Sequence, residues 1–351
     1  MRAQFLILIE VIILLTYWSY TGFYILNDID NHDDNGGSDG TLRFITCRFD
    51  HFSGLGNQLF RIASLYGIGQ KLRRKVYFNS NLPTVRKAFL NFEQNFPNIA
   101  NDAVTLVNTS LITEKVVLFG MNDRQYDNPM LIVKKTKYLK IAGNYIQSYK
   151  YFDGYQSDIK RIFTCQSTVT LDKRYVLDFH WRNEWHKKTH NLCVHTRRGD
   201  FLGIPFFRAS SKQFTDPAVK TVLQTITSSN QSKVNVIYFG DDPQFVNGLY
   251  RSPQKGVKYF DMHKLQLTDV EELCFGIQNC DTVLLTATGS TFGWWLAYLH
   301  KKDGNVYYDG ILSNYKVHGW NINDYVPSNW HRICADSGIA QVSHVPCPMR
   351  A

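Results

Sequence analysis

Several common signatures are missing from this chain of 351 residues. Its seven cysteines include no pair at the Cys-x-x-Cys spacing of zinc sites, so nothing in the sequence indicates a zinc module. There is no run of five or more basic residues and no internal repeat, although the formal net charge is +9. The missing basic tract argues against nucleic acid as a partner. The positive charge fits either a basic surface or a small polyanionic ligand.

A long apolar run stands near the N-terminus. Residues 5–26 would cross roughly 30 Å of hydrocarbon as a helix, with one acidic residue, Glu10, near the start. A cleaved signal peptide would have a shorter apolar core and a small-x-small cleavage site, so an uncleaved anchor is favoured. Residues 1–4 carry the positive flank and would form a cytoplasmic tail. The rest of the chain would then face the secretory lumen.

The segment after the anchor is polar. Residues 27–42 are rich in Asp, Asn and Gly and have almost no apolar content, which is typical of a short stalk. Two acceptor sequences for N-glycosylation, which begin at Asn108 and Asn230, agree with a lumenal chain.

Cysteines in an oxidising lumen favour disulfides, and an odd number leaves at least one thiol unpaired. Cys274 and Cys280 are not expected to pair with each other, because on one helix they would be separated by about 9 Å of rise. Cys193 lies within an expected strand, and we predict that it is a buried free thiol.

From residue 43 onward, strand patterns alternate with helix patterns, which indicates parallel sheets covered by helices. Functional sites in such sheets lie at the carboxyl ends of the strands. No regular element is expected from about residue 311. Strands are expected at 43–49, 75–79, 115–120, 191–196, 234–239, 282–286 and 305–308, and helices near 59–72, 215–228, 242–250, 268–278 and 291–301.

Two adjacent arginines, Arg197 and Arg198, follow the expected strand 191–196. Guanidinium groups stay charged and offer a planar fork of donors that suits a diphosphate. Neighbouring side chains of a strand point to opposite sides, so one arginine should face the phosphate while the other pairs with Asp200 or another carboxylate. His195 lies on the same side as Arg197. It either binds the ligand or is a buried histidine of the core.

The next strand ends in two aspartates followed by a proline. Asp241 and Asp242 precede Pro243, an arrangement that suits the first turn of a helix. One aspartate would cap this helix, and the other would be free to accept N–H groups of a guanine base.

A third loop follows the strand at 282–286. Ser290 or Thr291 would cap the next helix, and Gly289 allows a ligand to approach the backbone closely. A helix N-terminus of this kind binds anions. Trp294 and Trp295, further along the helix, are expected in the core.

Four motifs together resemble the α-1,2-fucosyltransferase family, glycosyltransferase family 11. They are GLGNQLF at 54–60, HTRRGD at 195–200, FGDDP at 239–243 and GSTFGWWLAYL at 289–299, and the resemblance covers roughly residues 43–310. The His-x-Arg-Arg-x-Asp element alone is shared with other fucosyltransferases, and the combination narrows the resemblance to this family.

The resemblance implies an α/β fold of the GT-B-like class, with two Rossmann-like domains that face a cleft. Residues 43–180 would be the acceptor-side domain, and residues 181–345 would bind GDP-fucose. Arg197, Arg198 and Asp200 are the catalytic candidates, with both arginines near the donor pyrophosphate. The implied donor-binding residues are Gly56, Asn57, His195, Asp241, Asp242, Ser290, Thr291 and Phe292.

The chemistry of such a site requires positive charge at the leaving diphosphate, which arginines and a helix N-terminus supply without a metal or other cofactor. An Asp-x-Asp pattern, the metal-holding element of many glycosyltransferases, occurs only at 28–30, in the stalk, where no apolar framework fixes it. Related α-1,6 enzymes carry a Glu beyond the arginine pair, whereas FLGIPFF follows Asp200 here. No general base is therefore assigned.

The function implied by the resemblance is inverting transfer of L-fucose from GDP-fucose to O2 of a terminal galactose on a glycan. The enzyme would be a single-pass type II protein of the Golgi membrane, with a homodimer left open. Two alternatives remain: a fucosyltransferase of another linkage or with a protein acceptor, and a silent lumenal glycan-binding homologue.

Overall fold

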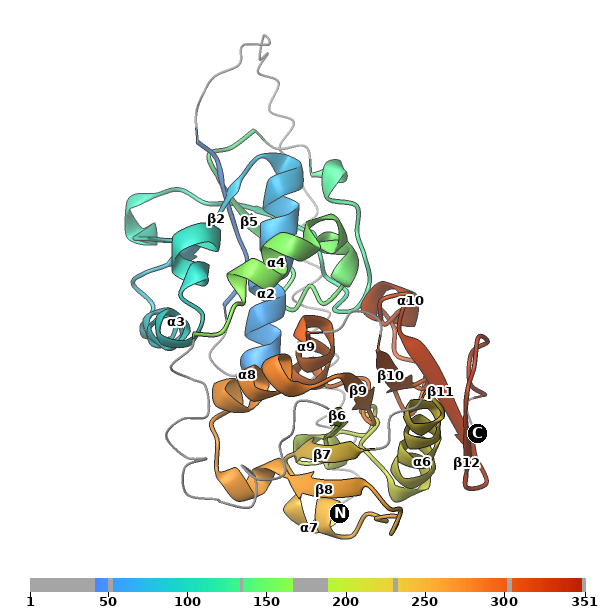
Figure 1. The fold of residues 1–351 in the computed structure, drawn as a ribbon. Coiled ribbons are helices and arrows are strands. Elements are labelled where there is room, and N and C mark those ends of the chain that lie inside the picture. The colour runs from blue at the N-terminus through green and yellow to red at the C-terminus, as the bar shows by residue number, and fades with distance from the viewer. Residues whose placement is uncertain are drawn as a thin grey trace, which may run out of the picture. The chain divides into compact units, whose positions relative to one another are not determined.

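A computed structural model describes residues 42–49, 53–132, 135–166, 189–229, 233–301 and 305–348 (Figure 1). These residues belong to one compact unit, Leu42–Ala351. The expected anchor at 5–26, the stalk, Asn230 and the expected domain boundary at 180/181 lie outside them. No helix within the described ranges is long and apolar enough to cross a bilayer.

A five-stranded sheet forms the first half of the described chain. Its strand order is β3-β2-β1-β5-β4, and every neighbouring pair is parallel. The strands are β1 (Phe44–Thr46), β2 (Lys75–Asn79), β3 (Val104–Val107), β4 (Lys115–Val117) and β5 (Tyr138–Ile141). The helices of this half are α2 (Leu55–Leu72), α3 (Pro83–Asn95) and α4 (Gln156–Ile162).

A seven-stranded sheet forms the second half, in the order β12-β11-β10-β9-β6-β7-β8. Only the β11–β12 pair is antiparallel among the described strands. The strands are β6 (His190–Thr196), β7 (Val234–Gly240), β8 (Val257–Asp261), β9 (Thr282–Leu285), β10 (Val306–Asp309), β11 (His331–Asp336) and β12 (Ile339–Val342). The helices are α6 (Lys212–Ser228), α7 (Pro243–Asn247), α8 (Asp269–Asn279), α9 (Thr291–Leu299) and α10 (Ile322–Tyr325).

Single helical turns complete the described structure. They are Ile99–Ala103, Thr109–Leu111, Pro129–Leu131, Tyr149–Tyr151, Asp153–Tyr155, Asp200–Leu202 and Met262–Leu265.

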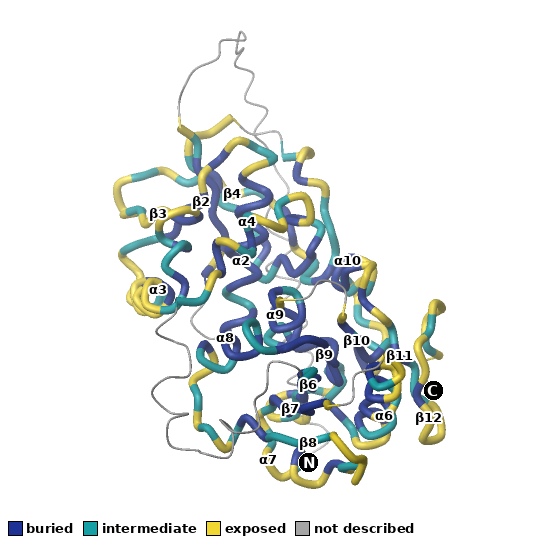
Figure 2. The backbone as a smooth tube through the Cα atoms, viewed as in Figure 1, coloured by how far each residue is buried: buried dark blue, intermediate teal, exposed yellow. Residues whose placement is uncertain are grey.

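The parallel part of the second sheet has the strand order of a Rossmann fold. In chain order, its strands are arranged 3-2-1-4-5-6, so the direction of winding switches between β6 and β9. Strands β6, β7 and β9 are buried along almost their whole length, which is typical of parallel strands covered on both faces (Figure 2). Ligands of such sheets bind outside the carboxyl ends at this switch point. The prediction of an α/β fold with parallel sheets is confirmed, and the second sheet has the Rossmann strand order.

An aromatic core joins the two halves. Helix α2 lies against α9 (Figure 1), and the ring of Phe60 is centred 4.5 Å from Trp294 and 5.0 Å from Trp295. The indole Nε1 of Trp295 donates to the carbonyl of Gly56 at 2.9 Å. Both tryptophans are fully buried, so their predicted place in the core is confirmed.

Three disulfides are formed by the described cysteines: Cys165–Cys274, Cys193–Cys280 and Cys334–Cys347. The prediction that Cys193 is a free thiol is wrong, because the end of α8 brings Cys280 over β6, with a Cα–Cα distance of 5.7 Å. The free thiol is that of Cys47, and burial raises its pKa to about 12. The prediction of at least one unpaired thiol is thus confirmed, but that thiol belongs to Cys47, directly after β1 of the first sheet.

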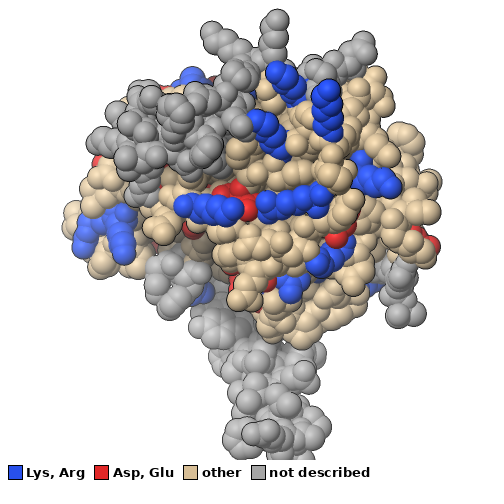
Figure 3. Space-filling model, turned by 60° about the horizontal axis from the view of Figure 1, so that its bottom comes forward, with Lys and Arg blue, Asp and Glu red and all other residues tan. Residues whose placement is uncertain are grey.

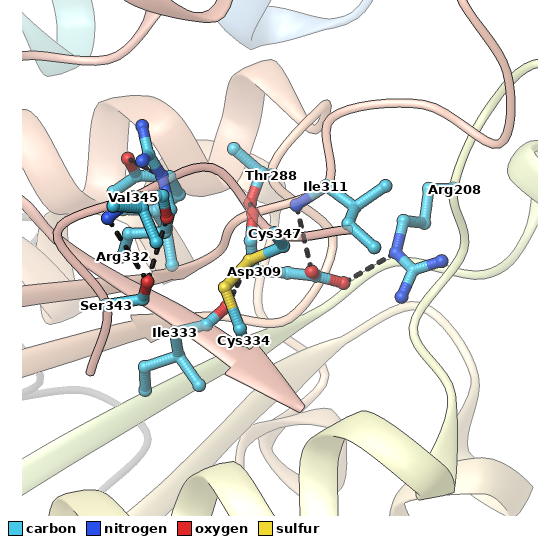
Figure 4. Close-up of a disulfide and its surroundings, with 11 residues drawn as sticks. Arg208, Thr288, Asp309, Ile311, Arg332, Ile333, Cys334, Ser343, Val345 and Cys347 are labelled. Carbon is cyan, nitrogen blue, oxygen red and sulfur yellow. Dashed lines mark hydrogen bonds and ion pairs between the residues drawn. A yellow bond between two sulfur atoms is a disulfide. The ribbon is translucent and has the colours of Figure 1, made fainter. Parts of the chain in front are cut away.

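The C-terminal segment, for which no element was expected, forms the β11–β12 hairpin. The disulfide from Cys334 to Cys347 fixes the chain after β12 to β11 (Figure 4). Beside it, the guanidinium of Arg208 pairs with the buried carboxylate of Asp309 at 2.7 Å. Burial raises the pKa of Asp309 to about 6 despite this arginine. The aromatic residues of the segment, Trp320 and Trp330, pack in the core.

Candidate active site

The loops after β6 and β7 bring two arginines and three carboxylates together. We call Arg197, Arg198, Asp200, Asp241 and Asp242 the arginine cluster. Arg197 pairs with Asp200 at 2.8 Å and with Asp241 at 3.1 Å. Arg198 pairs with Asp242 at 2.9 Å, and its backbone N–H donates to Asp241 at 2.9 Å. Two cations and three anions leave this cluster with a formal charge of −1 before any ligand binds.

The pairing departs from the sequence prediction in two respects. Arg197 makes the expected pair with Asp200, but Arg198 also has a carboxylate partner. Asp242 caps α7 by accepting from the N–H of Phe245, as predicted for one aspartate. The pKa of Asp242 is lowered by this N–H bond and then by Arg198. Asp241 was expected to be free, and this is wrong because its carboxylate forms an ion pair with Arg197 and accepts from the backbone N–H of Arg198.

Arg198 keeps donors available for a ligand. Its Nε and Nη1 donate to Asp242 and to the carbonyl of Ser210, whereas its Nη2 has no hydrogen-bond partner among the described residues. A quarter of the side chain is exposed, and its guanidinium lies 4.5 Å from the ring centre of Phe245. The guanidinium is thus held in place while one edge stays accessible.

His195 lies beneath these loops, at the end of β6. The residue is 3% exposed, and its Nδ1 has no hydrogen-bond partner among the described residues. Its ring stacks on Phe292, and Gly293 passes so close that a Cβ there would lie 2.6 Å from Nδ1. Burial, and secondarily the charge of Arg197, lowers the pKa of His195 to about 3. The imidazole is therefore neutral at physiological pH.

We expect His195 to make the protein less stable in mild acid. Its pKa is lower in the folded state than the unfolded value of about 6.5, so the unfolded chain binds the extra proton as the pH falls. Its contribution is complete above pH 6.5 and is lost toward pH 3, with about 2 kcal/mol lost by pH 5. Urea unfolding at pH 7 and pH 5 should show this difference, and the His195→Gln variant should show a smaller one. If the unfolding free energy of both proteins changed equally between pH 7 and pH 5, the buried neutral state of His195 would be contradicted.

The third loop leads from β9 into α9. Ser290 is the N-cap, and its hydroxyl accepts from the N–H of Gly293 at 3.5 Å, as predicted for Ser290 or Thr291. Helix α2 begins directly beside α9: a Cβ on Gly56 would lie 2.5 Å from the carbonyl carbon of Thr291. Two helix N-termini therefore meet at this point, and neither helix has an acidic residue in its first turn. Both ends carry partial positive charge.

The loops after β6 and β9 are joined through Ser210. Its hydroxyl accepts from the backbone N–H of Arg197 at 2.9 Å and lies 2.7 Å from the hydroxyl of Thr286. The predicted motifs therefore meet at the carboxyl edge of the second sheet, together with the start of α2.

Two further residues link this edge to the first half. Arg124 donates through Nη2 to the carbonyl of Gly289 at 2.7 Å and through Nε to Gln147 at 3.0 Å. Gln147 in turn donates to the side chain of Asn57 at 2.8 Å, so Asn57 is tied to the loop that starts α9. Sequence reasoning did not find Arg124 or Gln147, because both lie in irregular segments with no motif.

The family follows from comparison with known sequences. The family description "Glycosyl transferase family 11" matches residues 55–331, which include all of the four motifs except Gly54, the first residue of the first motif. The chain belongs to this family. Two relatives named galactoside 2-alpha-L-fucosyltransferase, both from Caenorhabditis elegans, are 29% and 28% identical to it. The first alignment covers 92% of this chain and 85% of the relative, and the second covers 80% and 77%.

Solved structures are more distant from this family 11 chain. NodZ alpha-1,6-fucosyltransferase soaked with GDP-fucose aligns at 14% identity with a TM-score of 0.41, over 74% of this chain and 93% of that one. POFUT1 in complex with GDP-fucose aligns at 10% identity with a TM-score of 0.41, over 76% and 96%. Likenesses at this level carry no conclusion about the chain.

Another acidic residue of this family 11 chain lies near the arginine cluster. Glu272, on α8, is partly buried, and its pKa is raised to about 7 by burial and then by the charges of Asp269 and Asp241. Sequence reasoning missed it because one glutamate on an amphipathic helix carries no signal. No group of three His, Cys, Asp or Glu side chains suited to a metal ion occurs in the described ranges.

The face of the molecule drawn in Figure 3 is mixed in charge. Figure 3 shows Lys and Arg side chains in several groups, with Asp and Glu side chains among them. A cavity of about 900 Å³ lies between the start of α6 and the β11–β12 hairpin, lined in part by Arg208, Ser211 and Asn314. None of the predicted site residues lines it.

The exposed side chain of Asn108, the other predicted glycosylation site, accepts from Ser110 and Asn81.

Proposed function

We propose that this family 11 glycosyltransferase transfers L-fucose from GDP-fucose to O2 of a terminal galactose, with inversion at the fucosyl carbon. One observation carries the proposal: the arginine cluster and the N-terminus of α9 meet at the switch point of a Rossmann-type sheet, where nucleotide ligands bind. The relatives named galactoside 2-alpha-L-fucosyltransferase support the choice of sugar and linkage.

The donor would lie across the carboxyl ends of β6, β7 and β9. Arg198 would grip the diphosphate through its unpartnered Nη2, and Arg197 would hold the loop by its two carboxylate contacts. The N–H groups at Thr291 and Phe292 would meet the distal phosphate at the start of α9. His195, buried and neutral, adds no charge at this position.

The reaction would be driven mainly by stabilisation of the leaving group. When the fucosyl C1–O bond breaks, negative charge develops on GDP, and preorganised donors lower the barrier by meeting that charge. The acceptor hydroxyl attacks C1 from the opposite face, so the configuration inverts, and its proton passes to a base. Asp200 is 56% exposed and already ion-paired, and no other carboxylate follows it in the loop. The base is therefore left unassigned.

The proposal includes a cleft between the two sheets, with the acceptor bound on the side of the first, and a lumenal location behind a Golgi membrane anchor. Three disulfides support an oxidising compartment, since such bonds are rare in the cytosol. The apolar run at 5–26 supports the anchor.

Transfer to galactosides tests the proposal directly. The purified full-length chain in detergent is incubated with GDP-fucose and a panel of β-galactosides, and NMR of the product identifies the linkage. We expect α-1,2-linked fucose on terminal galactose and competition by GDP. Absence of transfer, together with absence of GDP-fucose binding in calorimetry, would contradict the proposal, and another linkage would correct its acceptor part.

The same assay with a chelator tests whether the transfer needs a metal ion. Since arginine and helix N-termini supply the positive charge, we expect activity in excess EDTA to stay within about twofold of the untreated rate. The same assay with added Mg²⁺ or Mn²⁺ serves as the control. Complete loss in EDTA, restored by a divalent cation, would contradict metal-independent transfer.

A further inference from the structure

Arg124 is a buried cation that forms no ion pair within the part of the chain that the structure describes. The residue is 3% exposed, and it forms no ion pair with a carboxylate among the described residues. A buried charge is costly unless it is compensated. Aromatic faces give part of the compensation, since the guanidinium lies 3.7 Å from the ring centre of Trp320 and 4.6 Å from that of Tyr325. The charge of the neighbouring Asp123 also acts on the guanidinium, but the two side chains form no ion pair among the described residues, and burial raises the pKa of the Asp123 carboxyl. The positive charge is therefore only partly compensated.

Arg124 contacts the loop between β9 and α9, which we call the donor loop. Its Nη2 holds the carbonyl of Gly289, the residue before the N-cap of α9. Its Nη1 is buried without a hydrogen-bond partner among the described residues. This nitrogen also lies next to Gly289, 3.4 Å from the position that a Cβ of Gly289 would take. Through Gln147, the same guanidinium also fixes Asn57 in the first turn of α2. Arg124 thus contacts both sides of the meeting point of the two helices.

The charge balance at this point differs from that of the arginine cluster. The cluster has more carboxylates than arginines, whereas the N-termini of α2 and α9 have no acid in their first turns. Arg124 adds a full positive charge behind these two partial ones. An anion at the start of α9 would balance all three.

We propose that Arg124 is a positioning residue for the donor diphosphate: it fixes the Gly289 carbonyl and places an unpaired positive charge behind the N-terminus of α9. The inference rests on the proposed function in taking the anion to be a nucleotide diphosphate. The charge stabilises the leaving diphosphate without direct contact, because electrostatic interactions are strong at a water-poor site. Through Gln147 and Asn57, Arg124 also links helix α2 of the first half to the loop between β9 and α9.

The Gln147→Glu variant tests the charge while keeping the shape. A glutamate of the same size still accepts from Nε of Arg124 and now pairs with it. It cannot donate to Asn57 as Gln147 does, so the Asn57 amide must turn over to donate to the carboxylate instead. We expect the Kd for GDP to rise about tenfold, because the cancelled charge no longer reaches the diphosphate. Guanosine, which lacks phosphate, serves as the control ligand, and its Kd should stay within about twofold.

Calorimetry and thermal unfolding of the variant decide the outcome. An unchanged Kd for GDP in the folded variant would overturn the proposal, and so would an equal loss for GDP and guanosine, since that pattern indicates a damaged site. Inorganic pyrophosphate separates this inference from the proposed function. If wild type binds no GDP but is stabilised by pyrophosphate more than Gln147→Glu is, the anion site stands and the nucleotide assignment fails.

Substitution of the arginine itself gives an independent readout. We expect Arg124→Gln to raise the Kd for GDP about tenfold and Arg124→Lys, which keeps the charge, to recover most of that loss. The matched control is Arg74→Gln. Arg74 is a buried arginine of the first sheet that donates to the carbonyls of Phe44 and Thr136, and its loss should reduce stability but not GDP affinity. A lysine variant no better than the glutamine variant would overturn the role of charge.

Discussion

Replacing Arg198 with alanine is expected to reduce kcat/KM for fucose transfer by about 10²–10³-fold in a protein that remains folded. The change removes the guanidinium whose Nη2 is available to a ligand and leaves the arginine cluster one charge more negative. Asp241 and Asp242 would then repel the diphosphate. Stability should fall by at most about 1 kcal/mol, because the lost ion pair is partly exposed. Steady-state kinetics and thermal unfolding measure the two effects separately.

Arg161→Ala is the matched control for this experiment. Arg161, like Arg198, is an ion-paired arginine, but its partners are Asp102 and Asp158, it lies on α4, and its side chain is 48% exposed. Its removal should leave transfer unchanged. If Arg198→Ala retained activity within two- or three-fold of wild type, the assignment of the diphosphate to this cluster would be wrong.

Gly56→Ala is expected to impair both stability and transfer. A Cβ at this position would lie 2.5 Å from the carbonyl carbon and 2.6 Å from the next backbone nitrogen at Thr291–Phe292. Backbone atoms of a buried helix cannot yield as a flexible side chain does, so α2 and α9 must move apart. We expect a loss of about 1–3 kcal/mol in unfolding free energy, as for overpacked cores, and a drop in kcat/KM of at least about tenfold.

Gly54→Ala separates the clash from the loss of a glycine. A Cβ on Gly54 would meet nothing within 4 Å, and its φ of −60° suits alanine. This variant should lose only about 0.5 kcal/mol, the difference between glycine and alanine at an N-cap, and keep full activity. Equal behaviour of the two variants in urea unfolding and kinetics would show that the contact between α2 and α9 is not needed.

The central strands and helices could be predicted from the sequence because their patterns are long. β6 and β7 are seven-residue strands with buried apolar runs, and Asp242, Thr268 and Ser290 mark the starts of α7, α8 and α9 by their capping side chains. A polar residue interrupts each of the four-residue strands β3 and β5, and the β11–β12 hairpin at the sheet edge has a mixed pattern, so these strands were missed.

The sequence was enough to predict which loops form the site, but not which arginine pairs with which carboxylate. Parallel strands bring their carboxyl ends to one edge, so the motifs containing Arg197, Asp241 and Ser290 were expected together. Which carboxylate meets which arginine depends on how the loops turn after the strands. Arg124 gave no signal at all, since its role comes from contacts with Gly289, 165 residues away in the chain.

The pairing of the cysteines constrains how a newly made chain matures. Cys165, in the first half, pairs with Cys274, which follows 109 residues later, and Cys193 pairs with Cys280. At about 5–20 residues per second, both early thiols are exposed for several seconds before either partner is synthesised. During that interval Cys165 and Cys193 can react only with each other or with Cys47, the one cysteine made before them. A premature bridge among these three thiols must be reopened before the native pairs form, and the finished Cys165–Cys274 link then limits how far the two halves of the described chain can separate.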